Sequence, residues 1–357
     1  MSISSKKKKK RNLKAVDFFC GAGGMTSGFR KAGIKVLAGI DIDTSCKDTY
    51  EKNNKGAIFI EENIKDLEVE KLATLIDIKR NDDNLVFIGC SPCQYWSIIN
   101  TDKTKSKQTR DLLKDFQRFV EYYKPGFIVI ENVPGLYTKK EETPLTEFFR
   151  FLDKHDYKAD KKVLNASDYG VPQTRRRFLL IATRVERKII ELPSSTGKKA
   201  LVKDFIKDTK KFPPIKHGWT DPTDFIHTTA GLSSKNLRRL RLTKTNGGTR
   251  EGWKDHPELQ IKAYEGKDNI FKDVYGRMSW DYPGPTITTK FFSISNGRFA
   301  HPEQDRPISL REGATLQTFD MDYKFYGTSI GGIARQIGNA VPPELARRIG
   351  KALLNAE

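Results

Sequence analysis

Short apolar segments alternate with amphipathic ones from Ala15 to about Thr183, and this alternation constrains the fold more than any other feature of the chain. Five apolar runs, flanked by Gly, Pro or polar residues, have the length of buried strands: 15–19, 36–41, 85–89, 127–131 and 178–182. Between them, Leu112–Tyr123 repeats its apolar residues at helical spacing. The pattern predicts a Rossmann-like, doubly wound α/β sheet, mostly parallel and covered by helices on both faces. In such sheets ligands bind beyond the carboxyl ends of the strands.

The character of the sequence changes after about Val185. Residues 186–306 contain scattered Gly and Pro with little periodicity, and seven Lys or Arg residues stand against one acid between Lys235 and Lys254. Farther on, Pro342–Leu354 again has the pattern of an amphipathic helix, which we expect to pack on the first domain. We therefore predict a basic tail over 1–13, one domain formed by 14–185 plus 325–357, and a second domain over 186–324.

Composition indicates where the protein works and what it binds. Within its 357 residues no run approaches the ~18 apolar residues of a membrane span, and the N-terminus has no apolar segment typical of a secretory signal. We therefore expect a cytoplasmic protein without a membrane partner. The formal net charge of +19 points to a polyanion, most simply nucleic acid. Six of these charges lie in Lys6–Arg11. This run is either a solvated tail that attracts phosphates or a short nuclear localisation signal.

A glycine-rich segment, Asp17–Gly24, follows the first predicted strand and opens a helix that runs towards Gly33. Glycines there permit a tight turn and let a ligand lie against the backbone at a helix N-terminus. The second predicted strand ends at Asp41, a carboxylate in position to accept hydrogen bonds from ribose. A plain strand-to-helix turn is the alternative interpretation. Together the two features favour a nucleoside, although the spacing does not separate NAD from S-adenosylmethionine.

A reactive cysteine is predicted where the strand over 85–89 runs into Cys90-Ser-Pro-Cys93. Pro92 fixes φ and has no N–H, so the chain leaves the strand in a rigid turn with Cys93 at its tip. Because a free thiol has a pKa of roughly 8.5, Cys93 needs a helix N-terminus or an arginine to become a thiolate. A buried inert cysteine and half of a Cys-x-x-Cys zinc site are the alternatives. With Cys20 and Cys46, four cysteines are too few for a disulfide framework.

Several motifs then occur in one order. Pro92-Cys93-Gln94 after one strand, and Glu131-Asn132-Val133 after the next, resemble the cytosine-5 DNA methyltransferase family. Further elements similar to that family's are the cofactor loop Asp17–Gly24, the Gln-x-Arg-x-Arg element Gln173–Arg177, Arg311–Gln317 and Gln336–Pro342. The resemblance spans roughly Lys14 to Leu354. It implies the class I S-adenosylmethionine methyltransferase fold, with 186–324 as a smaller target-recognition domain.

The chemistry that the resemblance implies needs three groups. A thiolate attacks carbon 6 of cytosine, an acid protonates or hydrogen-bonds N3, and a donor holds the exocyclic oxygen, so that carbon 5 can take a methyl group. Cys93 and Glu131 supply the first two. By resemblance Arg177 holds the oxygen and Arg175 supports the site. Taken singly, each residue has an alternative interpretation. Glu131 could be a helix N-cap, and Arg175 and Arg177 could belong to a solvated basic turn.

By the same resemblance, S-adenosylmethionine lies across the first strand ends. Phe19 packs on the adenine or sulfonium side, Asp41 binds the ribose and Ile42 flanks the adenine. The remaining cofactor residues are Gly21, Ala22, Gly24, Asn63, Ile64, Pro92, Leu112, Asn339 and Val341. Asp41 stands where a Glu is usual, and Asn63 where an Asp often accepts the adenine amino group. An amide oxygen accepts that bond less strongly than a carboxylate.

The resemblance also implies duplex DNA as the substrate, with the target cytosine flipped out of the helix. The residues expected at the DNA are Gln94, Ser97, Arg238, Arg239, Arg241, Lys244, Arg250, Lys290 and Arg298. Arginines there bond either guanine edges or phosphates. The rival functions are an RNA cytosine-5 methyltransferase and a non-catalytic binding protein. We expect a monomer of the prokaryotic or viral type, nucleoid-associated, with a restriction endonuclease of the same specificity as a possible companion.

Overall fold

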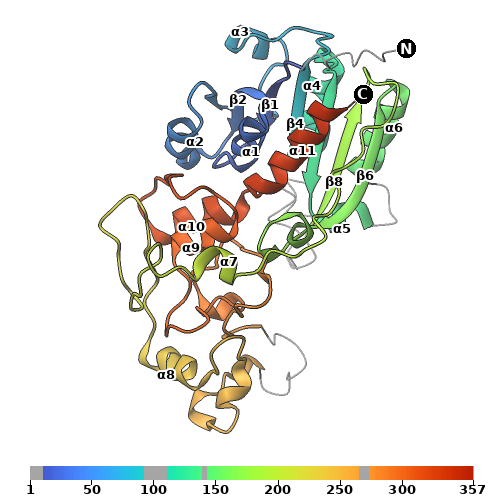
Figure 1. Cartoon of the computed structure of the whole chain (residues 1–357). Helices are drawn as coiled ribbons and strands as arrows, with labels where there is room; N and C mark the ends of the chain where they lie inside the picture. The colour runs from blue at the N-terminus through green and yellow to red at the C-terminus, as the bar shows by residue number, and fades with distance from the viewer. Residues whose placement is uncertain (1–10, 92–110, 139–142, 265–272, 357) are drawn as a thin grey trace, which may run out of the picture.

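A computed structural model describes residues 11–91, 111–138, 143–264 and 273–356 (Figure 1). Its centre is a seven-stranded sheet with the order β3-β2-β1-β4-β5-β8-β6. The strands are β1 Lys14–Phe18, β2 Lys35–Asp41, β3 Ile58–Glu61, β4 Leu85–Gly89, β5 Phe127–Asn132, β6 Lys158–Asn165 and β8 Arg176–Thr183. The first five are parallel, whereas β8 runs antiparallel to both β5 and β6. The mostly parallel α/β sheet expected from the sequence is therefore confirmed.

Helices cover both faces of the sheet. Their bounds are α1 Gly24–Ala32, α2 Lys47–Asn53, α3 Leu72–Leu75, α4 Leu112–Tyr123, α5 Pro134–Thr138, α6 Pro144–Lys154 and α11 Pro343–Asn355. On one face α4 and α6 bury Phe116 and Phe148 against Phe18 and Phe87 of the sheet. On the other, α1, α2 and α11 pack over alternate residues of the same strands. Removing so much apolar surface from water is the main source of stability for this layer.

Helix α11 returns the C-terminus to the first domain, where it lies beside α1 (Figure 1). The two helices approach closely because Gly28 has no side chain: a Cβ there would stand 2.3 Å from the carbonyl oxygen of Pro343. The observed helix is shifted by one residue from the predicted span over 342–354. None of the described helices has both the length and the apolar character needed to cross a membrane.

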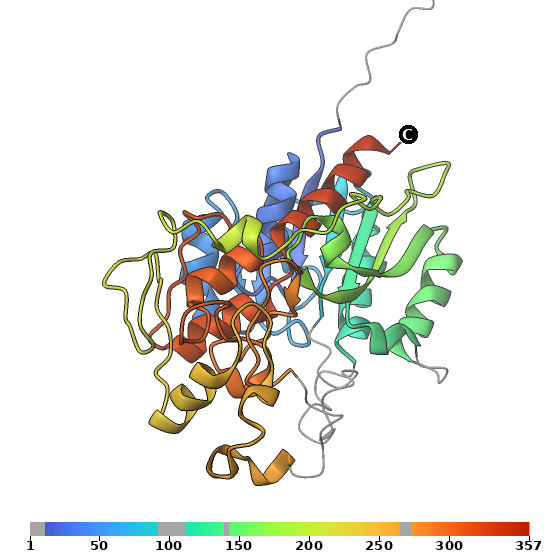
Figure 2. The same ribbon diagram turned by 60° about the horizontal axis from the view of Figure 1, so that its bottom comes forward.

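The second lobe contains little regular structure and packs around a core of its own. Its elements are α7 Lys203–Ile206, α8 Ser234–Leu242, β9 Gly284–Pro285 and α9 Leu310–Leu316. It is adjoined by β7 Gln173–Thr174 and α10 Ile330–Asn339, which lie within the predicted bounds of the first domain. Phe291, Ile308 and Ile337 belong to one apolar cluster that joins α9 and α10 to this lobe. Both views show the lobe, yellow to orange, beside the layered sheet (Figures 1 and 2). The exact boundary at 186 and 325 remains a prediction.

A short parallel pairing joins the two parts of the molecule, since β7 bonds with β9 of the second lobe. Next to it the amide of Gln173 donates to the carbonyl of Leu316 and to Gln317 Oε1, both at 2.9 Å. Gln173 Oε1 in turn accepts the backbone N–H of Ile287 at 3.1 Å. Because all these groups are buried, each needs its partner, and the bonds fix the second lobe against the catalytic sheet.

Candidate active site

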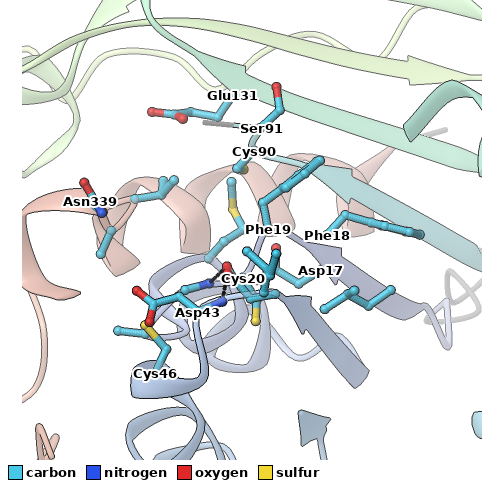
Figure 3. A pocket seen from close by; sticks show the side chains of 18 of the residues that line it. Asp17, Phe18, Phe19, Cys20, Asp43, Cys46, Cys90, Ser91, Glu131 and Asn339 are labelled. Carbon is cyan, nitrogen blue, oxygen red and sulfur yellow. Dashed lines mark hydrogen bonds between the residues drawn. The ribbon is translucent and has the colours of Figure 1, made fainter. Parts of the chain in front are cut away.

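A cavity of about 530 Å³ lies beyond the carboxyl ends of β1, β2, β4 and β5 and is closed by the end of α10. Most of the residues predicted for the cofactor line it: Phe19, Gly21, Ala22, Asp41, Ile42, Asn63, Ile64, Leu112, Asn339 and Val341. Glu131, Arg175 and Arg177 line it as well. Figure 3 shows Glu131, Ser91 and Cys90 at one end, Asp43 and Cys46 at the other, and Asn339 at the side. The fold thus brings Glu131, Arg175 and Arg177 into one cavity with most of the residues predicted for the cofactor.

The glycine-rich loop forms the floor of the cavity in a conformation that few residues adopt. Gly21 and Gly23 have φ values of 49° and 83°, and Phe19, at 64°, is also in the left-handed region. Gly24 does not line the cavity. A Cβ on it would stand 2.3 Å from the carbonyl oxygen of Val341, so this glycine allows α1 to pack against the segment after α10.

Asp41 ties this loop to β2. Its carboxylate accepts the backbone N–H of Gly21 at 2.8 Å through Oδ2 and that of Asp43 at 2.9 Å through Oδ1. Burial raises the pKa of Asp41 above its ordinary value, against the effect of these two bonds. Since two carboxylate oxygens offer about four acceptor sites, Asp41 can hold the loop and still accept ribose hydroxyls.

The surroundings of Asp41 suit a purine nucleoside. Ile42 is 67% exposed, an unusual state for an isoleucine, and its side chain lines the cavity. Phe19 from the loop and the polar side chain of Asn63 line the same space. An apolar surface for a flat base, a carboxylate for a ribose and an amide for a base edge are the groups that bind an adenosine moiety.

At the other end, Glu131 is positioned by β5 and is 7% exposed. Its Oε1 lies 2.9 Å from Nε of Arg177, which comes from the antiparallel neighbour β8. The contact is an ion pair without the direction of a hydrogen bond, and within the described ranges no donor satisfies Glu131 Oε1. A buried carboxylate oxygen that lacks a donor is costly, and a polar ligand in the cavity would satisfy it.

Arg175 points towards the second lobe. It is buried, and its guanidinium donates to the backbone carbonyls of Ile287 at 3.1 Å, Gly338 at 3.4 Å and Ala340 at 3.2 Å. Burial and the nearby charge of Arg177 lower the pKa of Arg175 to about 9. Its Nε has no acceptor among the described residues. Arg175 therefore holds the second lobe beside the cavity.

The predicted nucleophile Cys93 lies outside the described residues, as do Pro92, Gln94 and Ser97. Ser91, the last described residue before them, is held by Asn132, whose amide donates to the Ser91 carbonyl and hydroxyl oxygens at 3.3 Å. Burial raises the pKa of the neighbouring Cys90 thiol. Within the described ranges, His, Cys, Asp and Glu do not gather in a group of three or more that could hold a metal.

Several polar residues that the sequence did not single out as site residues also line the cavity, among them Asp17, Arg335 and Gln336. Asp17 was visible as the first residue of the glycine-rich segment. Its burial within β1, however, depends on the packing of α1, which the sequence pattern does not reveal. Arg335 and Gln336 reach the cavity from α10, which packs against the second lobe.

The basic residues predicted at the DNA have different environments. Arg239 is buried, donates to the carbonyl of Leu259 at 2.8 Å and lies over the rings of Trp253 and Tyr275. It supports the core of the lobe, so we remove it from the predicted DNA contacts. Arg238, Arg241 and Arg298 form ion pairs with Glu258, Asp305 and Asp273. Lys244 and Lys290 are exposed, and Arg250 lies over the ring of Tyr264.

A Rossmann-like sheet with a cavity at its strand ends, next to a buried carboxylate–arginine pair, is an arrangement typical of α/β enzymes. Comparison with known proteins identifies the class: the model of the C-5 cytosine-specific DNA methylase family matches residues 13–355. The chain belongs to this family, and it is a methyltransferase that acts on carbon 5 of cytosine in DNA.

Two relatives are similar over nearly the whole chain. The type II methylase M.HgiDII of Herpetosiphon aurantiacus is 38% identical over 344 residues, 95% of this chain and 94% of the relative. The type II methyltransferase M1.HphI of Haemophilus parahaemolyticus is 32% identical over 345 residues, 96% and 87% of the two chains.

Solved structures agree on the fold. A protein described as a DNA modification methyltransferase encoded within a prophage of E. coli has a TM-score of 0.72 at 22% identity, covering 97% of this chain and 99% of that one. The methyltransferase EhMeth of Entamoeba histolytica has a TM-score of 0.65 at 16% identity, with 96% and 98% covered. At these identities the likeness concerns the fold alone.

Proposed function

We propose that the protein takes its methyl group from S-adenosylmethionine and transfers it to a flipped-out cytosine through a covalent bond between Cys93 and carbon 6. The observation that carries this proposal is Glu131, a buried carboxylate in the cavity whose Oε1 has no hydrogen-bond donor among the described residues. Such an oxygen suits a carboxylic acid that binds ring N3 of the substrate base.

The cofactor would occupy the end of the cavity near Asp41. There Asp41 accepts the ribose hydroxyls, Ile42 and Phe19 enclose the adenine, and Asn63 faces its amino edge. Leu112, Ile64, Asn339 and Val341 form the remaining wall. When bound, S-adenosylmethionine supplies an electrophilic methyl group on its sulfonium.

The chain's own residues would then activate the cytosine. Cys93 as thiolate adds to carbon 6, and Glu131 gives a proton or hydrogen bond to N3, so that electron density reaches carbon 5. Arg177, already 2.9 Å from Glu131, orients this carboxyl and donates to the exocyclic oxygen. After carbon 5 has taken the methyl group, a base removes its proton, the Cys93–carbon 6 bond breaks and the thiolate is restored.

DNA would lie across the mouth of the cavity, since a base stacked in a duplex cannot reach Cys93. We propose 186–324 as the reading domain, with Arg238, Arg241, Lys244, Arg250, Lys290 and Arg298 at the DNA and Gln94 and Ser97 near the flipped base. The ion pairs of Arg238, Arg241 and Arg298 are exposed, and exposed pairs contribute little stability, so phosphates can replace their partners.

We further propose that the enzyme is a monomer that protects DNA from a restriction endonuclease of the same specificity. The restriction pairing is supported by two relatives named as type II enzymes that match over nearly the whole chain. Locating an endonuclease gene beside this one, and testing whether methylated DNA resists its product, would examine this part of the proposal.

The test of the reaction is transfer of radiolabelled methyl from S-adenosylmethionine to duplex DNA and to tRNA, using wild type, Cys93→Ser and Glu131→Gln. We expect label in DNA only, none with Cys93→Ser, and a loss in kcat of about 10²–10⁴-fold with Glu131→Gln at unchanged cofactor affinity. Label retained in full by Cys93→Ser would refute the covalent route, and label confined to tRNA would assign an RNA substrate.

A further inference from the structure

Asn63 stands where the adenine edge of the proposed cofactor would lie, two residues after β3, and it lines the cavity beside Ile64. The backbone turns sharply there, since the N–H groups of Asp66 and Leu67 both donate to the carbonyl of Asn63 at 2.9 and 3.0 Å. Arg118 of α4 donates to the carbonyl of Ile64 at 2.6 Å and holds the same turn from outside. The Asn63 side chain therefore projects from a fixed backbone.

An asparagine at this position creates a problem that an aspartate does not have. Both oxygens of a carboxylate accept hydrogen bonds, whereas an amide has one accepting end and one donating end. A 6-amino purine needs an acceptor opposite its amino group, and a 6-oxo purine needs a donor. The affinity of Asn63 for adenine thus depends on which way its amide is turned.

Two contacts of opposite polarity set that direction. Asn63 Nδ2 donates to Oδ2 of Asp66 at 2.7 Å, and Asn63 Oδ1 accepts the backbone N–H of Lys65 at 3.2 Å. In the reversed amide, Oδ1 would face the Asp66 carboxylate and Nδ2 would face an N–H group, so both contacts would become repulsive. The bond to Asp66 is the shorter one and its acceptor is charged, which makes it the stronger constraint.

We propose that Asp66 is a positioning residue that holds the Asn63 amide with its oxygen available to the adenine amino group, and that it thereby makes the site select 6-amino over 6-oxo purines. Asn63 Oδ1 has two lone pairs, of which Lys65 uses one. The Asn63–Asp66 pair then presents an acceptor to the adenine amino group, as the single carboxylate of an aspartate at position 63 would. This inference rests on the proposed use of S-adenosylmethionine.

Calorimetric binding of two unreactive ligands tests the pair: S-adenosylhomocysteine and its 6-oxo counterpart, S-inosylhomocysteine. Asp66→Ala should weaken the adenosyl ligand about threefold to tenfold and should reduce the preference over the inosyl ligand by about tenfold, because the freed amide can turn. Asp66→Asn, which keeps an acceptor without the charge, should give an intermediate preference.

Rescue by a second substitution separates this role from a general loss of structure. Asn63→Asp has no direction to fix, and its carboxylate is repelled by that of Asp66, so adding Asp66→Ala to it should leave adenosyl affinity unchanged or raise it. Equal weakening of both ligands by Asp66→Ala, or the same loss in the Asn63→Asp background, would overturn the inference while leaving the cofactor assignment intact. A wild-type protein that binds neither ligand would overturn the cofactor proposal and this inference together.

Discussion

Asp17 is a residue whose ionisation is coupled to folding. It is completely buried in β1, where Oδ2 accepts the hydroxyl of Thr26 at 2.7 Å and Oδ1 finds no donor in the described parts of the chain. Burial raises the pKa of Asp17 from 3.8 to about 7, only partly offset by the bonds to Thr26. The folded protein therefore holds a proton there that the unfolded chain releases.

This predicts a fall in stability as pH rises from about 4 to about 7, up to ~1.4 kcal/mol for each pH unit, with no further contribution above the folded pKa. Asp17→Asn cannot ionise and imitates the neutral acid. We expect the difference in Tm between Asp17→Asn and wild type, measured in parallel across this range, to increase in favour of the variant as pH rises. Above about pH 7 the difference should become constant. A constant difference in Tm between the two proteins would contradict the prediction.

At the scale of elements, the segment between α9 and α10 contacts the glycine-rich loop Asp17–Gly24 on the side away from the cavity. Tyr323 lies in this segment, is buried in the second-lobe core, and donates its hydroxyl to the carbonyl of Ala22 in the glycine-rich loop. Asn54, just after α2, donates in turn to the Tyr323 oxygen at 3.2 Å. Three segments distant in sequence thus meet beneath the cavity.

Tyr323→Phe should leave the Ala22 carbonyl without its donor, at a cost of ~1–2 kcal/mol, and should weaken S-adenosylmethionine binding severalfold because the loop loses its support. Tyr157→Phe is the matched control: its hydroxyl also donates to a buried carbonyl, that of Pro125, but outside the cavity. Calorimetry and thermal melting should show both variants destabilised and only Tyr323→Phe impaired in cofactor binding. Equal cofactor affinity in both would refute the link.

How far the sequence predicts an element depends on how much of it is buried. The interior strands β1, β2, β4, β5 and β8 and helix α4 have dense apolar patterns, and all six were predicted within two residues of their ends. Strands β3 and β6 were missed. β3 has four residues, and β6, at the sheet edge, exposes Lys158, Lys161 and Lys162. Edge strands of this kind carry little of the apolar signal on which the prediction relies.

The site shows the same dependence. Asp41 was predicted because it ends an apolar run, and Glu131 because Glu131-Asn132-Val133 resembles a family motif; the fold brings both to one cavity. Arg239 was predicted at the DNA because the sequence does not distinguish a surface arginine from a buried one. In the structure its guanidinium bonds to a backbone carbonyl and lies over an aromatic ring. The Asn63–Asp66 contact was not predicted because it depends on the turn after β3.

For the whole molecule, the net charge of +19 governs association with DNA. Replacing Lys6–Lys10 by glutamine removes five charges without changing chain length. Because each neutralised phosphate adds ~0.9 to the slope of log affinity against log salt, non-specific DNA binding should become weaker and less salt-dependent. Titrations of labelled DNA at several salt concentrations measure this, and kcat at saturating DNA should stay unchanged. An unaltered slope would exclude the tail from DNA contact.

The joint between the lobes has a consequence for altering the recognised sequence. Arg175 and Gln173 bond mainly to backbone groups: those of Ile287 and Leu316 in the second lobe, and those of Gly338 and Ala340 at the end of the adjoining α10. Backbone carbonyl and N–H groups remain available for these bonds when the surrounding side chains are substituted. Residues 207–283 could therefore be replaced by the corresponding segment of a relative without loss of these bonds to the catalytic sheet. The condition is that the flanking segments keep their backbone conformation. If the second lobe reads the DNA as we propose, such a replacement should transfer sequence specificity without changes to the catalytic residues.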